Sequence, residues 1–568
     1  MDKKTLLVVI ACLIALLVSQ MVINRIYPPR PKQPRPPAMV QTNTMAPAAS
    51  NETSQPLVSA APPASPAKEA SVVEPEEAQG PEQTITFSNQ YIRIEFTSRG
   101  GGVKTVELLK HKASETGPVT LNGTNLVPAL AMIGITNAGP NTAYLMEQPT
   151  PNTIIMKRRT QTGLAITKTF RMGEAYLLSN TIEIARVSES ASALPTNAAV
   201  TIGTATPASA KELPIYLTAS WLAGEKYQYR DLKQIAKNAD KGTAAESINA
   251  RWGAVKDQFF TMILTPATNA TTIAYNEIVL PPPPDWTSRQ PPQGVTATLS
   301  FPPANVTSNA AERFEFTWYA GPKEYDRLEA LRNGQEEVMQ FGFWGVISVV
   351  LLKSMKFFYR LIPNYGVSII IITVLIKFIF WPIQAKSIKS MKAMQKFQPL
   401  MNKLREKYKD DAQRLNTEMM KLYKEHKINP FAGCLPMVVQ IPVFFALFTM
   451  LRSAVELRGA HFLWIHDLSA PDTLFHVAGF PVNLLPLLMT ALSIWQMKIT
   501  PQSGDQQQQK MMMFMPLMML FFFYSTSSGL VLYWTVQQFL SIAQQWWSMR
   551  RPDMAPPAGP AASTGKAK

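Results

Sequence analysis

One apolar stretch with a single cation inside it constrains most strongly what this chain can fold into. From Tyr365 to Pro382 every residue is apolar or uncharged except Lys377. The stretch is about as long as a helix needs to cross a bilayer. An ammonium group within hydrocarbon costs about 2.5–3.5 kcal/mol on insertion scales, unless the lysine stem carries it to the interface. The chain therefore either uses this lysine or lets it snorkel, and the sequence leaves both alternatives open.

The segment after this stretch is strongly basic. Between Lys386 and Lys427 the chain has twelve Lys and Arg against five Asp and Glu. Positive charge collects in the cytoplasmic loops of membrane proteins, so we expect this loop on the cytoplasmic side.

The same loop carries a helical pattern over residues 384–429. Apolar residues recur at steps of three and four on both sides of Lys409–Asp411, which predicts a two-helix hairpin with a basic surface. Pro399 is expected to kink the first helix. Two roles stay open, a connector between spans or a docking arm for a cytoplasmic partner. The expected apolar seam consists of Ile388, Met391, Met394, Phe397, Met401, Leu404, Tyr408, Leu415, Met419, Leu422 and Tyr423.

Composition places the whole chain among membrane proteins with a large soluble insert. The 568 residues carry a net charge of +16 and are 46% hydrophobic, with the apolar residues concentrated at the N-terminus and after Phe341. The excess positive charge is explained by loop topology and contact with anionic lipids, so we expect no nucleic-acid sequence recognition. The two cysteines, Cys12 and Cys434, lie in or beside apolar segments, so the insert must fold without disulfides.

The first third of the chain divides into three parts. Residues 1–27 contain an apolar run from Leu6 to Ile23 and predict an uncleaved signal-anchor span. Residues 28–80 are rich in Pro and Ala, which predicts a semi-extended linker. Over residues 81–330, short segments with period-two alternation are separated by Gly, Pro and Asn turns. This pattern predicts an all-β sandwich outside the membrane.

The rest of the chain is expected to be helical. Residues 331–361 hold an apolar stretch that looks too short to span, which favours an interfacial amphipathic helix. Residues 362–550 predict a five-span core, and residues 551–568 a disordered tail. With the N-terminal anchor the count is six spans, which places both termini in the cytoplasm. The expected core spans are Tyr365–Pro382, Phe431–Leu451, Val482–Met497, Met511–Ser525 and Leu530–Trp547.

Motifs of catalysis and metal binding are missing from the sequence. It has no phosphate-binding loop, no His-Glu-x-x-His and no cysteine pair at metal spacing. His461, His466 and Asp467 could form part of a metal site, but structural capping is the favoured interpretation because metals need three or more convergent ligands. We therefore expect no enzyme activity, no cofactor and no metal.

Several motifs after Phe341 occur together in one known family. The chain resembles the YidC family of bacterial membrane protein insertases, in the Gram-negative form with a large periplasmic domain. The resemblance is strong from Phe341 to Arg551 and weaker but collinear through the preceding domain. The matching stretches are Tyr365–Pro382, Asn429–Pro436, Gln440–Pro442, Leu463–Ala470 and Ser528–Tyr533.

The resemblance implies how the core works. Five spans would enclose a hydrophilic groove that is open to the cytoplasm and the lipid and closed to the periplasm. Lys377 falls where the family usually has a groove arginine, with Thr373 and Gln440 nearby. A greasy slide for the departing substrate span would comprise Ile441, Phe444, Tyr533 and Trp534.

The resemblance also implies location and partners. The protein would sit in the bacterial inner membrane with its β-supersandwich domain in the periplasm. Its partners would be nascent membrane proteins, the lipid bilayer and the Sec translocon. The cytoplasmic hairpin would meet the ribosome and the signal-recognition-particle receptor through Lys403, Arg405, Lys407, Lys409, Asp410 and Asp411.

Two functions of other classes remain as alternatives. A secondary transporter would show inverted repeats with broken helices in corresponding halves, and no such pairing is visible. A membrane-anchored carbohydrate-binding protein would use its β-sandwich, with Trp252, Asp257 and Trp318 as possible sugar contacts.

Overall fold

A computed structural model describes most of the chain between residues 81 and 550. The signal anchor and linker predicted for residues 1–80, and the tail predicted for residues 551–568, lie outside the described residues. The description between 81 and 550 leaves gaps at 115–116, 124–126, 188–194, 196, 208–211, 238–243, 283–289, 303–310, 410, 427–434 and 501–505.

The smaller sheet of the β-domain has four antiparallel strands in the order β1-β2-β3-β4. In β2 the residues Ile92, Ile94 and Phe96 are fully buried, whereas the intervening Arg93 is exposed. The period-two pattern of the sequence is therefore the alternation of a core face and an outer face. The strands are β1 (Thr84–Ser88), β2 (Ile92–Thr97), β3 (Gly102–Ser114) and β4 (Gly117–Leu121).

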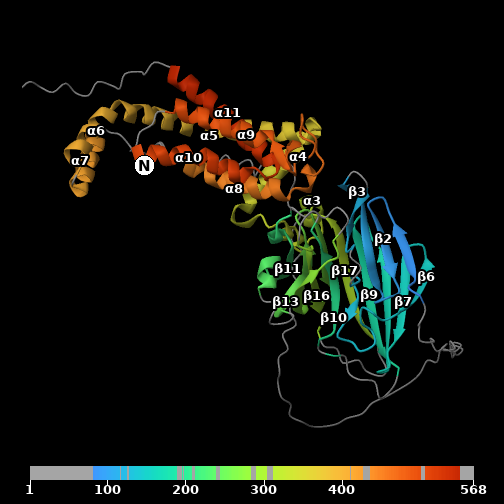
Figure 1. Cartoon of the computed structure of the whole chain (residues 1–568). Coiled ribbons are helices and arrows are strands. Elements are labelled where there is room, and N and C mark those ends of the chain that lie inside the picture. The colour runs from blue at the N-terminus through green and yellow to red at the C-terminus, as the bar shows by residue number, and fades with distance from the viewer. Residues whose placement is uncertain are drawn as a thin grey trace, which may run out of the picture. The chain divides into compact units, whose positions relative to one another are not determined.

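The larger sheet is antiparallel as well and follows the path β5-β10-β16-β15-β13-β14-β17-β9-β8-β7-β6, with β11 joining β13 to β12 (Figure 1). The prediction of an all-β domain is confirmed. The strands are β5 (Met132–Ile133), β6 (Leu145–Thr150), β7 (Thr153–Arg159), β8 (Leu164–Met172), β9 (Leu177–Arg186), β10 (Ala199–Ala205), β11 (Thr218–Ala223), β12 (Lys226–Asp231), β13 (Ala244–Lys256), β14 (Phe260–Pro266), β15 (Ala270–Val279), β16 (Gln293–Ser300) and β17 (Glu312–Pro322).

Contacts between the two sheets include one buried cation. The rings of Phe96 and Phe170 lie 5.3 Å apart, centroid to centroid. Beside them, Lys168 of β8 is fully buried and donates hydrogen bonds to the carbonyl oxygens of Gly101 and, at 2.6 Å, Leu130. Burial in this apolar core lowers the pKa of Lys168 to about 7.

The helical region begins after the β-domain. Helix α11 packs against α5 and α9, α9 packs against α10, and α4 packs against α5 and α8. The helices are α3 (Tyr325–Ala330), α4 (Gly345–Leu361), α5 (Tyr365–Lys396), α6 (Gln398–Lys407), α7 (Ala412–Glu425), α8 (Leu435–Ser453), α9 (Leu484–Ile499), α10 (Gln506–Phe523) and α11 (Ser528–Arg550), with single 3-10 turns at Gln335–Met339, Gly342–Trp344 and Val455–Leu457.

A helix lies at each of the five expected core spans. In the described part of the chain, however, only two helical stretches are long and apolar enough to cross a membrane: Gly342–Leu361, which was not expected to span, and Tyr365–Lys396. The first corrects the expectation that this stretch is too short, because Gly342–Trp344 extends α4 by one turn. Shorter apolar helices follow at Val438–Ser453, Leu484–Ile499 and Phe514–Phe523. The six-span count therefore stays a prediction.

The hairpin has two helices, as expected, and an apolar seam that contains seven of the eleven expected residues but not Ile388, Met391, Tyr408 or Leu415. Helix α5 runs on to Lys396 and the chain bends at Phe397, with Pro399 in the first turn of α6, where a missing N–H costs nothing. The side-chain carboxylate of Asp411 caps α7 by accepting a hydrogen bond from the Arg414 amide at 2.9 Å. The buried seam consists of Met394, Met401 and Leu422, flanked by Phe397, Leu404, Met419 and Tyr423.

The stability of the β-domain should rise with pH between about 7 and about 10. The unfolded chain keeps a proton on Lys168 up to its ordinary pKa of 10.5, whereas burial in the folded chain releases it from about pH 7. In that window the unfolded state binds more protons, so raising the pH favours folding by about 1.4 kcal/mol per pH unit for each such group. Burial also lowers the pKa of Lys323, to about 8, and that group adds to the same slope.

The test is chemical denaturation of the detergent-solubilised chain at several pH values, followed by near-ultraviolet circular dichroism. Lys168→Met should remove the contribution of one proton from the slope of the free energy of unfolding against pH. Lys226→Met, at an exposed lysine of β12, should leave that slope unchanged. An unchanged slope in Lys168→Met would show that the buried amine is not the titrating group.

Candidate functional site around Lys377

The candidate site is centred on a lysine of α5 that reaches across to α11. Lys377 is 3% exposed, and its Nζ donates a hydrogen bond to Ser541 Oγ at 2.7 Å. The Ser541 hydroxyl in turn donates to the carbonyl oxygen of Gln537 at 2.8 Å. The ammonium is therefore solvated by a neighbouring helix, which lowers the cost of keeping it among apolar residues.

This lysine is also electrostatically isolated in the sequence of the core. It is the only charged residue within residues 365–385, 435–451, 484–497, 511–523 and 528–549, the apolar parts of the five core helices. A charge with no opposite charge nearby, in a poorly polarisable region, exerts a strong field on any anionic group that approaches it.

The other two predicted groove residues have separate partners. Thr373 is fully buried, and its Oγ1 donates to the Ile369 carbonyl oxygen of its own helix at 2.7 Å. Gln440 of α8 donates from Nε2 to the hydroxyl oxygen of Tyr533 on α11 at 2.7 Å. The structure does not join Lys377, Thr373 and Gln440 to one another by hydrogen bonds.

The four predicted slide residues lie in different environments. Phe444 of α8 and Trp534 of α11 are half-buried, and their rings meet edge to face at 5.1 Å. Ile441 is 43% exposed, whereas Tyr533 is 1% exposed. Phe444, Trp534 and Ile441 thus reach the surface of the helices, and Tyr533 lies inside, bonded to Gln440.

A polar stripe on α11 completes the site and was not predicted from the sequence. The signal that could have found it is a Gln-Gln pair repeated after seven residues, which places the two pairs on one helical face. Gln538 donates to Ser493 Oγ of α9 at 2.9 Å, and Gln544 donates to the Trp381 carbonyl oxygen of α5 at 3.3 Å. The stripe comprises Gln537, Gln538, Ser541, Gln544 and Gln545.

Part of this stripe has unused hydrogen-bonding capacity. Among the described residues, the side-chain oxygens of Gln537 and Gln538 and the side-chain nitrogen of Gln545 are buried without a hydrogen-bond partner. A buried polar atom without a partner costs about 1–3 kcal/mol. These amides are therefore positioned to bind water or polar atoms of another molecule.

Two other predictions can be compared with the structure. Asp467 accepts hydrogen bonds from the amide and the hydroxyl of Ser469, both at 2.7 Å, which confirms a capping role. In the described part of the chain no three His, Cys, Asp or Glu side chains gather as metal ligands.

The proposed sugar contacts were wrong. Trp252 and Trp318 are fully buried, and the Asp257 carboxylate is buried against the backbone amides of Phe259 and Phe260 at 2.7 and 2.6 Å. Trp252 lies in β13 and Trp318 in β17, and the Asp257 carboxylate accepts its two hydrogen bonds within the turn that follows β13. All three side chains therefore belong to the core of the β-domain.

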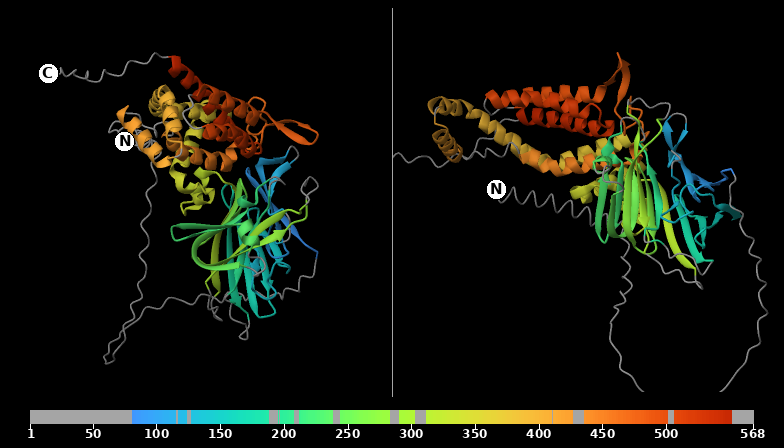
Figure 2. Two further views of the ribbon diagram at one scale, coloured as in Figure 1. Left: turned by 60° about the vertical axis from the view of Figure 1, so that its left-hand side comes forward. Right: turned by 60° about the horizontal axis from the view of Figure 1, so that its bottom comes forward.

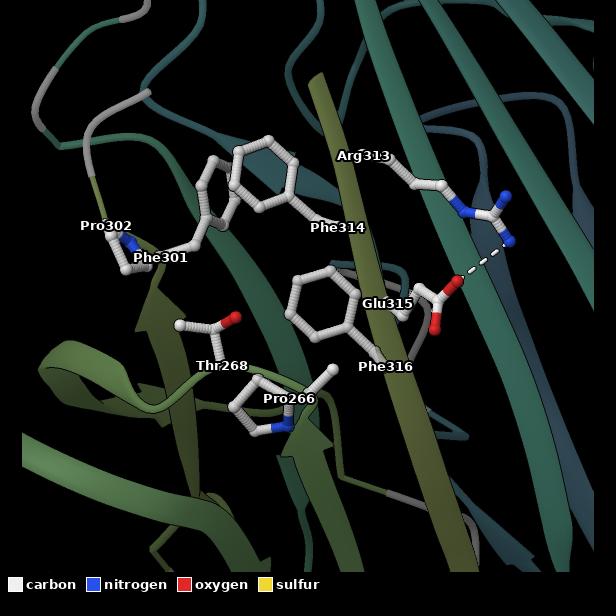
Figure 3. Close-up of a pocket in the computed structure, with 9 residues that line it drawn as sticks. Pro266, Thr268, Phe301, Pro302, Arg313, Phe314, Glu315 and Phe316 are labelled. Atoms are coloured by element: carbon white, nitrogen blue, oxygen red, sulfur yellow. Dashed lines mark ion pairs between the residues drawn. The ribbon is translucent and has the colours of Figure 1, made fainter. Parts of the chain in front are cut away.

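The β-domain does have a small pocket, far from Lys377 in the sequence. Its volume is about 190 Å³, and Figure 3 shows three phenylalanine rings on its wall with an ion pair at its rim. The pair joins Arg313 and Glu315 at 2.7 Å, and both side chains are more than half exposed. The rings are those of Phe301, Phe314 and Phe316.

Removing the partner of the ammonium should destabilise the core. Ser541→Ala leaves Lys377 with one hydrogen bond fewer, so we expect a loss of about 1–3 kcal/mol in the free energy of unfolding. Ser541→Thr keeps a hydroxyl and serves as the matched control. In a double-mutant cycle with Lys377→Met, the double variant should lose less free energy of unfolding than the two single variants lose in sum, because each single variant already breaks the same hydrogen bond. Strict additivity, measured by thermal unfolding in detergent, would mean that the two side chains do not interact.

Comparisons with known proteins cover almost all of the described chain. Residues 84–354 match the family model of the YidC periplasmic domain, and residues 357–555 match that of the 60Kd inner membrane protein. A "Membrane protein insertase YidC" from Cupriavidus necator is 35% identical over 532 residues, covering 90% of this chain and 91% of the relative.

Other relatives match a smaller share of the chain or are less similar in sequence. A protein of the same name from Pelobacter propionicus is 40% identical over 327 residues, covering 56% of this chain and 57% of the relative. The match spans between 51% and 57% of the length of this and two further relatives. The solved structure "Active YidC insertase crystal structure with the first transmembrane domain resolved" is 16% identical, with a TM-score of 0.34, over 81% of this chain and 91% of that one.

Proposed function

The chain belongs to the YidC family of membrane protein insertases, and from this premise we propose that it inserts newly made proteins into the inner membrane along a polar path centred on Lys377. The observation that carries the proposal is the Lys377–Ser541 pair, which holds the only charge within the apolar parts of the five core helices beside the glutamine stripe of α11. The large β-domain belongs on the periplasmic side.

The path lowers the barrier that a polar segment meets. An acidic segment that precedes a substrate span must cross hydrocarbon before the span can settle, at a cost of a few kcal/mol per charge. Lys377 attracts that segment, and the free amide atoms of Gln537, Gln538 and Gln545 replace part of its lost water. Partitioning of the span into lipid then drives the reaction, so no nucleotide is needed.

The short helices beside the path support the same mechanism. Helix α9 has 16 residues, and at the helical rise this is about 24 Å, less than the hydrocarbon thickness of about 30 Å. Such a mismatch thins the bilayer locally and shortens the polar segment's route. We assign the exit of the substrate span to the exposed side of α8 and α11, at Ile441, Phe444 and Trp534.

The topology we propose has six spans with both termini in the cytoplasm, and it keeps α4 at the membrane interface although the apolar stretch Gly342–Leu361 is long enough to cross a membrane. The hairpin then faces the cytoplasm, where Lys403, Lys407 and Lys409 are exposed. A basic surface of this kind suits the phosphates of a ribosome or an acidic face of the signal-recognition-particle receptor. Cooperation with the Sec translocon belongs to the same proposal and rests on the family alone.

Substitutions of Lys377 should separate the groove role from snorkelling. Lys377→Arg keeps the charge and should retain insertion, whereas Lys377→Glu repels acidic segments and should reduce insertion by more than about tenfold, or about 1.4 kcal/mol. Lys377→Ala should impair substrates with acidic translocated tails most and those with neutral tails least. The measurement is protease protection of a substrate series that differs only in tail charge.

Snorkelling makes the opposite prediction for the same series. If the Lys377 side chain only extends its ammonium group to the membrane interface, its removal stabilises the span in lipid. Lys377→Ala would then leave the insertion of every substrate unchanged.

The hairpin is tested by reversing its charge without touching its seam. Lys403→Glu, Lys407→Glu and Lys409→Glu together should slow insertion severalfold, because they remove the attraction for an anionic partner. The control is Glu406→Lys, an exposed change on α6, the helix of Lys403 and Lys407, that adds a cation. Insertion of ribosome-bound nascent chains at the normal rate by the triple variant would favour the simple connector.

A further inference from the structure

The connection between α8 and α9 contains a small β-ribbon that the insertase proposal does not use. Strand β18 (Thr473–Val477) pairs with β19 (Phe480–Asn483), and Figure 2 shows the ribbon projecting from the helices, in orange. An isolated two-stranded ribbon is marginally stable in water, so its persistence depends on what holds and covers it.

The base of the ribbon is fixed by buried hydrogen bonds. Asp472, 3% exposed, accepts hydrogen bonds from the Leu485 amide at 2.7 Å and from Trp464 Nε1 at 3.3 Å. Asn483, 1% exposed, accepts from the Thr473 hydroxyl at 2.7 Å and donates to the Tyr524 carbonyl oxygen at 2.6 Å. These bonds tie the ribbon to the start of α9 and to the residue that follows α10, so its direction is set by the core.

The outer part of the ribbon is apolar and uncovered. Phe475 is 56% exposed, Val477 56%, Phe480 77% and Leu474 43%. Adjacent residues of a regular strand point to opposite faces, and the consecutive residues Phe475, His476 and Val477 are all exposed, so neither face of the ribbon is covered by the described part of the chain. Residues 473–483 include no Asp, Glu, Lys or Arg. Exposed apolar surface of this kind marks a contact with a membrane or with another protein.

Continuity with α9 favours the membrane. Leu484, Leu487 and Leu488 follow the ribbon directly and are 38%, 41% and 41% exposed, on a helix that we place in the bilayer. The ribbon therefore extends a lipid-facing surface, and apart from the imidazole of His476 it offers no ionisable side chain by which a protein partner would be selected. Its open strand edges would be costly deep in hydrocarbon, which limits it to the interfacial layer.

We propose that the β18–β19 ribbon is a membrane anchor, inserted into the interfacial layer of the leaflet at the N-terminal end of α9, with Phe475 and Phe480 against the acyl chains. The anchor would hold the outer ends of the short helices α9 and α10 at a fixed depth, because Asp472 and Asn483 connect it to both. This goes beyond the proposed function and takes from it only that α9 lies in the bilayer.

The test is the depth of spin labels in vesicles of phosphatidylethanolamine and phosphatidylglycerol. The chain has two cysteines, so Cys12→Ser and Cys434→Ser give a background for single labels at Phe475→Cys and Phe480→Cys. Collision with oxygen, which concentrates in lipid, is compared with collision with a water-soluble nickel chelate. Val279→Cys, 56% exposed on β15, is the aqueous control, and Ile494→Cys, 42% exposed on α9, is the lipid control.

Both ribbon labels should favour oxygen over nickel, with a logarithmic ratio of the same sign as at Ile494 but smaller. A ratio like that of Val279 would overturn the anchor, as would protection from both reagents, which would indicate a protein contact. Should Ile494 itself favour nickel, the bilayer placement of α9 falls, and the proposed function with it. Both labelled positions are more than half exposed, so the substitutions remove little packing.

Discussion

The hydrogen bond between the Lys377 ammonium and the Ser541 hydroxyl is the constraint on which the organisation of the helical region depends. A charge among apolar helices must find a polar partner or carry its full desolvation cost. Ser541 can serve only if α11 lies against α5, and the two helices do pack together. The cost of one cation thus selects a helix pair and orients the glutamine stripe of α11 toward it.

Some polar side-chain atoms of the core helices pair with a neighbouring helix, whereas others have no hydrogen-bond partner among the described residues. Gln440 with Tyr533, Gln538 with Ser493 and Gln544 with the Trp381 carbonyl group each join two helices. The remaining amide atoms of Gln537, Gln538 and Gln545 have no partner among the described residues. An arrangement that maximised stability alone would have filled these sites with apolar side chains, so their retention is consistent with binding something polar and transient.

The β-domain is stabilised by burial of apolar strand residues and not by a pair of polar side chains between helices. Alternating strands such as β2 bury one face, and the buried amine of Lys168 is bonded to carbonyl oxygens instead of to an acid. Burial lowers the pKa of that amine, so we expect the domain to gain stability as the pH rises from about 7 to about 10. The tryptophans that looked like ligand contacts in the sequence, Trp252 and Trp318, are core residues.

The sequence by itself determined the features that depend on local pattern. Period-two alternation predicted the β-domain, steps of three and four predicted the seam around Met401 and Leu422, and Pro399 predicted the break after α5. The isolated charge at Lys377 was visible for the same reason, since hydrophobicity is a property of a continuous segment. One length judgement was wrong, because the 3-10 turn at Gly342–Trp344 lengthens the apolar helical stretch of α4 to 20 residues.

Only the tertiary structure decided which of these residues meet. Lys377 and Ser541 are 164 residues apart, and Gln440 and Tyr533 are 93 apart, so no periodicity relates them. The family resemblance placed Tyr533 on the slide, and the structure adds that its side chain is 1% exposed and its hydroxyl accepts a hydrogen bond from Gln440. The exposure of the β18–β19 ribbon could not be predicted from the sequence either, because an apolar segment has the same composition whether a protein core or a lipid covers it.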